Sequence, residues 1–177
     1  MKTSKTYKLV VSASMAALAI IIDYFSVRTN ITKFTVYGLP LLITGILFGP
    51  WIGALAGAVV GFITQIIFYG ITVTTPIWMV APIMWGFMSG LLAKILIKNN
   101  ELTIPSLVTI VVVTSLTATA CNSVAIYLDG VIFEYPTSVT FATIGVRVLI
   151  ALGLDVVYCF IIYPIYPRLV RFGHQKT

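Results

Sequence analysis

The sequence predicts an all-α fold, a six-helix transmembrane bundle with its N- and C-termini in the cytoplasm. Composition is the first reason. Only 9% of the 177 residues are charged while 59% are hydrophobic, and the mean hydropathy is +1.06. Soluble domains carry about a quarter charged residues, so this composition excludes a soluble enzyme or a nucleic-acid-binding protein despite the formal charge of +6. The other two reasons are the apolar segments and the positions of the cations.

Six long apolar segments follow one another with short connections. They cover about 8–27, 36–50, 51–71, 76–97, 104–128 and 142–166. A membrane helix needs about 20 apolar residues. The runs are continuous rather than alternating, so they predict helices and not barrel strands. The second segment is short and meets the third at Gly49-Pro50-Trp51. The first resembles a signal peptide but continues into Asp23 without a clear cleavage site, so we expect it to be a span.

The cations predict the orientation. With the N-terminus in the cytoplasm, the inside segments carry Lys2, Lys5, Lys8, Lys94, Lys98, Arg168, Arg171 and Lys176. The outside segments carry Arg28 and Lys33, and Arg147 lies within a span. Cytoplasmic loops of membrane proteins hold an excess of Lys and Arg. Asp129 then falls in the outside loop between the fifth and sixth spans.

No pattern of catalytic, cofactor-binding or metal-ligating residues is found. The sequence has no GxSxG, P-loop or HExxH motif. Its single histidine, His174, lies in the C-terminal tail, and Cys121 and Cys159 are expected to be core residues within spans. We therefore expect no enzyme activity, no cofactor and no metal.

Polar and aromatic side chains gather in the outer halves of five spans. Such groups are expensive in a membrane and suggest a functional site. We predict that they line a substrate cavity open to the outside, formed by Gln65, Tyr69, Trp78, Trp85, Asn122 and Arg147. Structural roles are the alternatives: Trp78 and Tyr69 as interfacial residues, Gln65 and Asn122 as interhelical hydrogen bonds, and Arg147 extending to the headgroups.

Two further acids lie in the spans. Asp23 ends the first span at the outside, where it either belongs to the polar groups that could line the cavity or lies among the outer headgroups. Asp155 is the deepest acid, about 12 Å along the helix from Arg147, and we expect it to form a structural hydrogen bond with another helix. No second buried acid lies at a similar depth, which argues against a proton relay.

Two further features concern a covering loop and a helix face. The loop from Arg28 to Tyr37 carries both outside cations and several hydroxyls, and we expect Arg28, Lys33, Thr35 and Tyr37 to contribute to a lid. Small residues recur at four-residue spacing at Gly45, Gly49, Gly53, Gly57 and Gly61, and again at Ala13 and Ala17. Such stripes let helix backbones approach closely, either within the bundle or against a partner membrane protein.

Three stretches give the chain a family resemblance. They are YGLPLLITGILFGPWIGA from Tyr37, the pair Ala13 and Ala17, and PIWMVAPIMWGFMSGL from Pro76. Together with the six spans and the size, the chain resembles the substrate-binding S components of energy-coupling factor (ECF) transporters, which capture vitamins in bacteria and archaea. The resemblance covers nearly the whole chain.

The resemblance implies a mechanism and partners. Residues 1–177 would be one transmembrane substrate-binding domain of an ABC importer in the bacterial cell membrane, with its site facing outside. It would bind a vitamin under the first loop and associate through Ala13 and Ala17 with an EcfT-like coupling subunit and two cytoplasmic ATPases. ATP hydrolysis in those partners would reorient the chain and release the vitamin inside.

The substrate is predicted from the residues of the expected site. Arg147, Arg28 and Lys33 suit a carboxylate, the aromatic rings suit an organic body, and Gln65 and Asn122 suit amides and hydroxyls. Pantothenate fits this set first. Folate also fits, although the FPGFT stretch of the folate-type members of the family is replaced by VTTPIW in this sequence. Hydroxymethylpyrimidine would fit without needing Arg147. Riboflavin and thiamine fit the motifs less well. A small secondary carrier or channel acting as an oligomer is the alternative class, and an interaction protein without a ligand is a third.

Overall fold

The computed structural model describes residues 5–28, 33–97, 101–134 and 138–174, without the side chains of 28, 33–34, 138–141 and 170–174. Within these ranges the chain forms six helices: α1 Lys5–Tyr24, α2 Gly38–Phe48, α3 Pro50–Tyr69, α4 Thr75–Leu96, α5 Ile104–Ile132 and α6 Ser138–His174. Two short strands, β1 Val27–Arg28 and β2 Lys33–Phe34, pair antiparallel with Val27 opposite Phe34. The all-helical prediction is confirmed.

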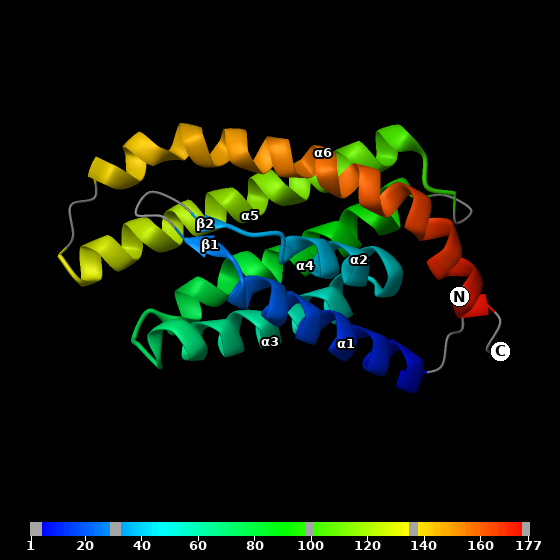
Figure 1. Ribbon diagram of the computed structural model, residues 1–177, viewed down its shortest axis with the longest axis horizontal. Coiled ribbons are helices and arrows are strands. Elements are labelled where there is room, and N and C mark those ends of the chain that lie inside the picture. The colour runs from blue at the N-terminus through cyan, green and yellow to red at the C-terminus, as the bar shows by residue number, and fades with distance from the viewer. Residues whose placement is uncertain (1–4, 29–32, 98–100, 135–137, 175–177) are drawn as a thin grey trace.

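The helices lie along one another in a bundle (Figure 1). The start of α1 and the end of α6 lie at the same end of the bundle, and α1 and α6 occupy opposite edges of the view. Five helices are long and apolar enough to cross a membrane, and α2 is a shorter apolar helix. Large apolar side chains are left exposed, such as Phe160 at 77% and Leu149 at 71% on α6. Lipid, not water, is the solvent that suits this surface.

The expected boundaries of α2, α3 and α4 lie close to those in the structure, whereas α1 begins and ends earlier than expected, with Val27 in β1, and the last two helices are longer than expected. α5 continues to Ile132, so Asp129 lies in its last turn and not in a loop as predicted. α6 has 37 residues, with Pro164 and Pro167 inside it. A helix of that length spans about 55 Å, well beyond the roughly 30 Å of a hydrocarbon core. Hydropathy marked only its apolar middle because the polar ends continue the helix outside the lipid.

Glycines hold α2, α3 and α4 together. A Cβ on Gly53 would collide with the carbonyl of Gly86, a Cβ on Gly86 would collide with that of Gly53, and a Cβ on Gly57 would meet the carbonyl of Pro82. We call this close backbone contact the glycine seam, meaning the approach of Gly45, Gly53 and Gly57 to residues 82–90 of α4. The small-residue stripe on these helices is therefore used for internal packing rather than for a partner.

A sharp turn precedes α3. Gly49 has φ +90°, a conformation that favours glycine. Pro50 then begins α3, where its fixed φ suits the first helical turn. α2 therefore ends at Phe48, and α3 returns beside it.

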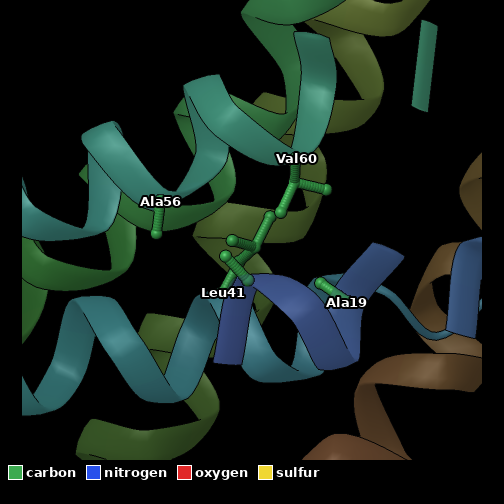
Figure 2. Close-up of a cluster of buried hydrophobic side chains, with 5 residues drawn as sticks. Ala19, Leu41, Ala56 and Val60 are labelled. Carbon is green, nitrogen blue, oxygen red and sulfur yellow. The ribbon is translucent and has the colours of Figure 1, made fainter. Parts of the chain in front are cut away.

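An apolar cluster joins α1 to this unit. Ala19 of α1, Leu41 of α2, and Ala56 and Val60 of α3 are buried against one another (Figure 2). A second cluster joins α2 to α5 and α6, centred on Leu42, Leu107, Val111, Tyr158 and Ile162. Trp85 of α4 packs against both clusters, so this tryptophan connects the two parts of the hydrophobic core.

Candidate functional site

A cavity of about 320 Å³ lies between the helices. Its wall brings together residues from each of the helices α1 to α6 and from the segment that precedes α2. The polar and aromatic members are Asp23, Thr35, Tyr37, Thr64, Gln65, Phe68, Tyr69, Trp78, Trp85, Ser115, Thr119, Asn122, Arg147 and Tyr158. Ligand cavities commonly measure about 300–1,000 Å³, so this one suits a small organic molecule.

All six side chains predicted to line a substrate cavity meet at this one. Gln65 and Tyr69 come from α3, Trp78 and Trp85 from α4, Asn122 from α5 and Arg147 from α6. Gln65 is buried, whereas Tyr69 is 63% exposed and lies at the rim. Their common location agrees with the prediction, while their role in substrate binding stays a prediction.

The two tryptophans are held by different contacts. Trp78 Nε1 donates a hydrogen bond of 3.2 Å to Asp129 Oδ1 at the end of α5. Trp85 lies edge to face with Tyr158, with ring centroids 5.9 Å apart and an interplanar angle of 76°. The first contact holds the indole near the start of α4, and the second holds the indole seven residues later, so contacts within the protein fix both indoles of the cavity wall.

The segment before α2 closes one side of the cavity. Thr35 Oγ1 donates to Asp23 Oδ1 over 3.2 Å and accepts from the backbone N–H of Tyr37 over 3.3 Å. Asp23 is only 2% exposed, so it lies inside the bundle and not among the outer headgroups. Thr35 and Tyr37, two of the four expected lid residues, thus line the cavity. The side chains of Arg28 and Lys33 lie outside the described residues.

Arg147 is the cation of the described cavity wall. It is half-buried, and its Nη1 atom has no hydrogen-bond partner among the described residues. A buried guanidinium donor left unpaired costs more than most polar groups. The geometry therefore offers a charged, bidentate donor to an anion that enters the cavity.

Asp155 does not make the hydrogen bond expected of it. Its side chain is 2% exposed, and neither carboxylate oxygen has a partner among the described residues. Ser115 lies beside the carboxyl group, yet not at hydrogen-bond distance. The hydrogen bond was expected only because Asp155 lies deep in its span, and buried polar groups usually have a hydrogen-bond partner.

Phe68 and Tyr158 of the cavity wall were not predicted, because each has an ordinary explanation in the sequence as an interfacial ring or a core residue. Ser115 lies seven residues before Asn122 in the sequence, and this spacing indicates that both lie on one face of α5. Nothing in the sequence showed which face of α6 met them.

Comparison with known proteins gives the fold and the family. One solved structure, described as FolT bound with folic acid, matches with a TM-score of 0.67 and 15% identity, over 93% of this chain and 96% of that one. Another, the S component of a bacterial ECF transporter, matches with a TM-score of 0.66 and 17% identity, over 97% and 99%. No match to a curated protein was found.

A family match at the level of sequence covers most of the chain, although the sequence identities to the two solved structures are low. Residues 3–168 match the family described as the S component of the ECF-type riboflavin transporter. This range includes every wall residue of the cavity. The family consists of membrane-embedded transporter subunits and not of enzymes. With six helices, one shared cavity and a family match over most of its length, the chain belongs to the family of ECF-type riboflavin transporter S components.

Proposed function

We propose that this S component captures a small carboxylate-bearing vitamin in its 320 Å³ cavity, with Arg147 as the carboxylate partner. The observation that carries the proposal is the unpaired Nη1 of Arg147 on the cavity wall. A carboxylate bound there would remove an unsatisfied charged donor and form charge-assisted hydrogen bonds. Pantothenate is our first candidate because it combines one carboxylate with an amide and hydroxyls.

The size of the cavity supports a small ligand. Its 320 Å³ lies near the lower limit for ligand sites, and pantothenate is smaller than folate or riboflavin. Gln65, Asn122, Thr64 and Thr119 supply donors and acceptors suited to an amide and hydroxyls.

Riboflavin is the second candidate. The name of the matching family favours it, and so do the flat rings of Trp78, Trp85 and Phe68 on the wall. Riboflavin has no carboxylate, so it would leave Arg147 without an anionic partner. Folate, the ligand bound in one of the similar solved structures, has carboxylates but is the largest of the three.

Thermal stabilisation of the purified full-length chain separates these candidates. Pantothenate, folate, riboflavin and hydroxymethylpyrimidine are each added at the same concentration, because a tight ligand raises the unfolding temperature by mass action. Pantothenate alone should stabilise the wild-type chain and should lose that effect in Arg147→Ala. Stabilisation by riboflavin that survives in Arg147→Ala would replace the carboxylate proposal. No stabilisation by any of them in a folded sample would argue against vitamin capture at this cavity.

The proposal includes orientation and partners. We place both termini in the cytoplasm of a bacterial cell and the cavity toward the outside, which agrees with the predominance of inside cations. Ala13 and Ala17 are exposed on α1, in keeping with contact to a transmembrane coupling subunit that joins the chain to two ATPases. Residues 33–37 would cover the bound vitamin.

A further inference from the structure

The buried polar side-chain atoms without a partner concentrate on two facing helices in the part of the chain that the structure describes. Five buried side-chain atoms lack a partner among the described residues: Thr114 Oγ1, Ser115 Oγ, Arg147 Nη1 and both oxygens of Asp155. All belong to α5 or α6. The assignment of Arg147 to a ligand anion leaves the pair formed by Ser115 and Asp155 without a role.

Ser115, like Thr114 beside it, differs from several other hydroxyls of α5. Thr109, Thr117 and Ser123 of α5 donate to the carbonyl four residues earlier, over 2.9, 2.7 and 2.9 Å. This is the usual arrangement for a hydroxyl within an apolar helix. Ser115 is fully buried at 0% exposure and makes no such bond, although it lies on the cavity wall. Its hydroxyl is therefore free to serve another group.

Among the residues that the structure describes, the neighbours of Asp155 supply no counter-charge. Tyr158 and Cys159 lie near it on α6, and Ser115 faces it from α5. Tyr37, which precedes α2, lies near Tyr158. Arg147 is eight residues away on the same helix, about 12 Å by helical rise. An ionised carboxylate that is buried without a partner or nearby cation is strongly unfavourable, so the carboxyl group is stable here as a neutral acid.

A neutral acid changes what Ser115 can offer. A carboxylate accepts hydrogen bonds only, whereas a protonated carboxyl group has one O–H donor. If Asp155 accepted from Ser115, the serine hydrogen would point away from the cavity. If Asp155 donates to Ser115 Oγ, the serine hydrogen is left to donate into the cavity.

We propose that Asp155 is a positioning residue for the vitamin site, which as a neutral acid donates to Ser115 Oγ and directs the Ser115 hydroxyl hydrogen toward a ligand acceptor. This inference rests on the proposed function for its ligand, but the state of Asp155 is testable without one.

The position of Ser115 adds a requirement for the ligand. Asp155 lies opposite Ser115, and α5 and α6 run antiparallel, so Asn122 lies at about the depth of residue 148, next to Arg147. Ser115 is seven residues from Asn122, which is about 10 Å deeper by helical rise. The substrate class is thus an elongated acid with a second oxygen acceptor about 10 Å from its carboxylate.

Infrared difference spectroscopy of the ligand-free full-length chain tests the hydrogen bond directly. The wild type at neutral pH should show the C=O stretch of a protonated carboxyl group, and Asp155→Asn should remove it. Ser115→Ala should shift the band to higher frequency because the acceptor is lost. The matched control, Ser123→Ala on the same helix, should leave the band in place. A wild type without the band, or a band that moves in Tyr158→Phe and not in Ser115→Ala, would overturn the inference.

Binding of pantothenate as the probe provides the second arm. Ser115→Ala and Asp155→Leu should weaken its affinity by a similar factor of about three to ten, the usual effect of one hydrogen bond. Asp155→Asn keeps a donor beside Ser115 and should stay within about twofold of the wild type by the same reasoning. Wild-type affinity in Asp155→Leu would refute the positioning role. If pantothenate does not bind at all, the substrate proposal fails, and the infrared arm still decides the state of Asp155.

Discussion

At the scale of single residues, the cavity wall combines side chains that are fixed with side chains that await a partner. Trp78 is anchored by Asp129, and Thr35 is anchored by Asp23. Arg147 keeps an unpaired donor. A site whose aromatic wall is already ordered loses less conformational entropy on binding, so the unpaired donor can contribute most of its interaction energy to affinity.

Replacement of the unpaired cation should affect binding strongly. We expect Arg147→Ala to weaken the binding of an anionic vitamin by about tenfold or more, since hydrogen bonds to charged groups contribute about 1.5–3 kcal/mol. Calorimetric titration of the purified chain measures the change. Arg168→Ala is the matched control, because Arg168 lies on the same helix but is exposed and away from the cavity wall. Equal affinities in the two variants would remove Arg147 from the site.

The anchor of Trp78 should affect binding less. Asp129→Ala removes the acceptor of the 3.2 Å hydrogen bond and lets the indole rotate, so we expect affinity to fall about threefold to tenfold, as for one lost hydrogen bond. Asp129→Asn retains an acceptor oxygen and should bind nearly as the wild type does. The same titration checks both variants, and an equal loss in Asp129→Asn would mean that charge at the cavity mouth matters rather than the position of Trp78.

At the scale of helices, the glycine seam sets the stability of α2, α3 and α4. Gly53→Ala should lower the thermal unfolding midpoint, because the added methyl group meets the carbonyl of Gly86 and overpacking typically costs about 1–3 kcal/mol. Gly153→Ala on α6 is the control, since nothing lies within 4 Å of its added methyl group. There alanine should leave the midpoint unchanged or raise it, as alanine is the better helix former. A midpoint that falls equally in both variants would contradict the seam.

The same scale shows what the sequence could predict. Long apolar runs and the Gly49-Pro50 turn indicated the helices, because these signals act locally. The four-residue spacing of small residues indicated a contact surface, yet whether α4 or a partner would cover it depended on tertiary packing. The missing partner of Asp155 was equally hidden, since helical periodicity gives the depth of a side chain but not the side chains opposite it.

At the scale of the whole molecule, the exposed small residues of α1 are separate from the cavity. Ala13 and Ala17 are exposed, whereas Ala16 and Ala19 of the same helix are buried in the bundle. The helix thus has one face for the core and one face that a membrane partner can approach closely. Binding and coupling can therefore be separated by substitution.

Bulky residues on that face should uncouple transport. Ala13→Trp or Ala17→Trp should abolish vitamin uptake by cells that contain the complete importer, while the purified chain binds its ligand with wild-type affinity. Val156→Trp is the control, because Val156 is exposed on α6 at the opposite edge of the bundle (Figure 1). Normal uptake by the α1 variants would exclude this face as the contact with the coupling subunit.

The glycine seam also determines which parts of the cavity wall can move. Where backbone touches backbone, sliding one helix past another brings carbonyl groups into collision, so α2, α3 and α4 behave as one rigid unit. The α5–α6 pair meets this rigid unit through side chains, including the Trp78–Asp129 hydrogen bond, whereas the Thr35–Asp23 hydrogen bond joins the segment before α2 to α1. Side chains can change rotamer at small cost. A ligand that passed between α4 and α5 would therefore require the Trp78–Asp129 hydrogen bond to open while the glycine contacts stay closed.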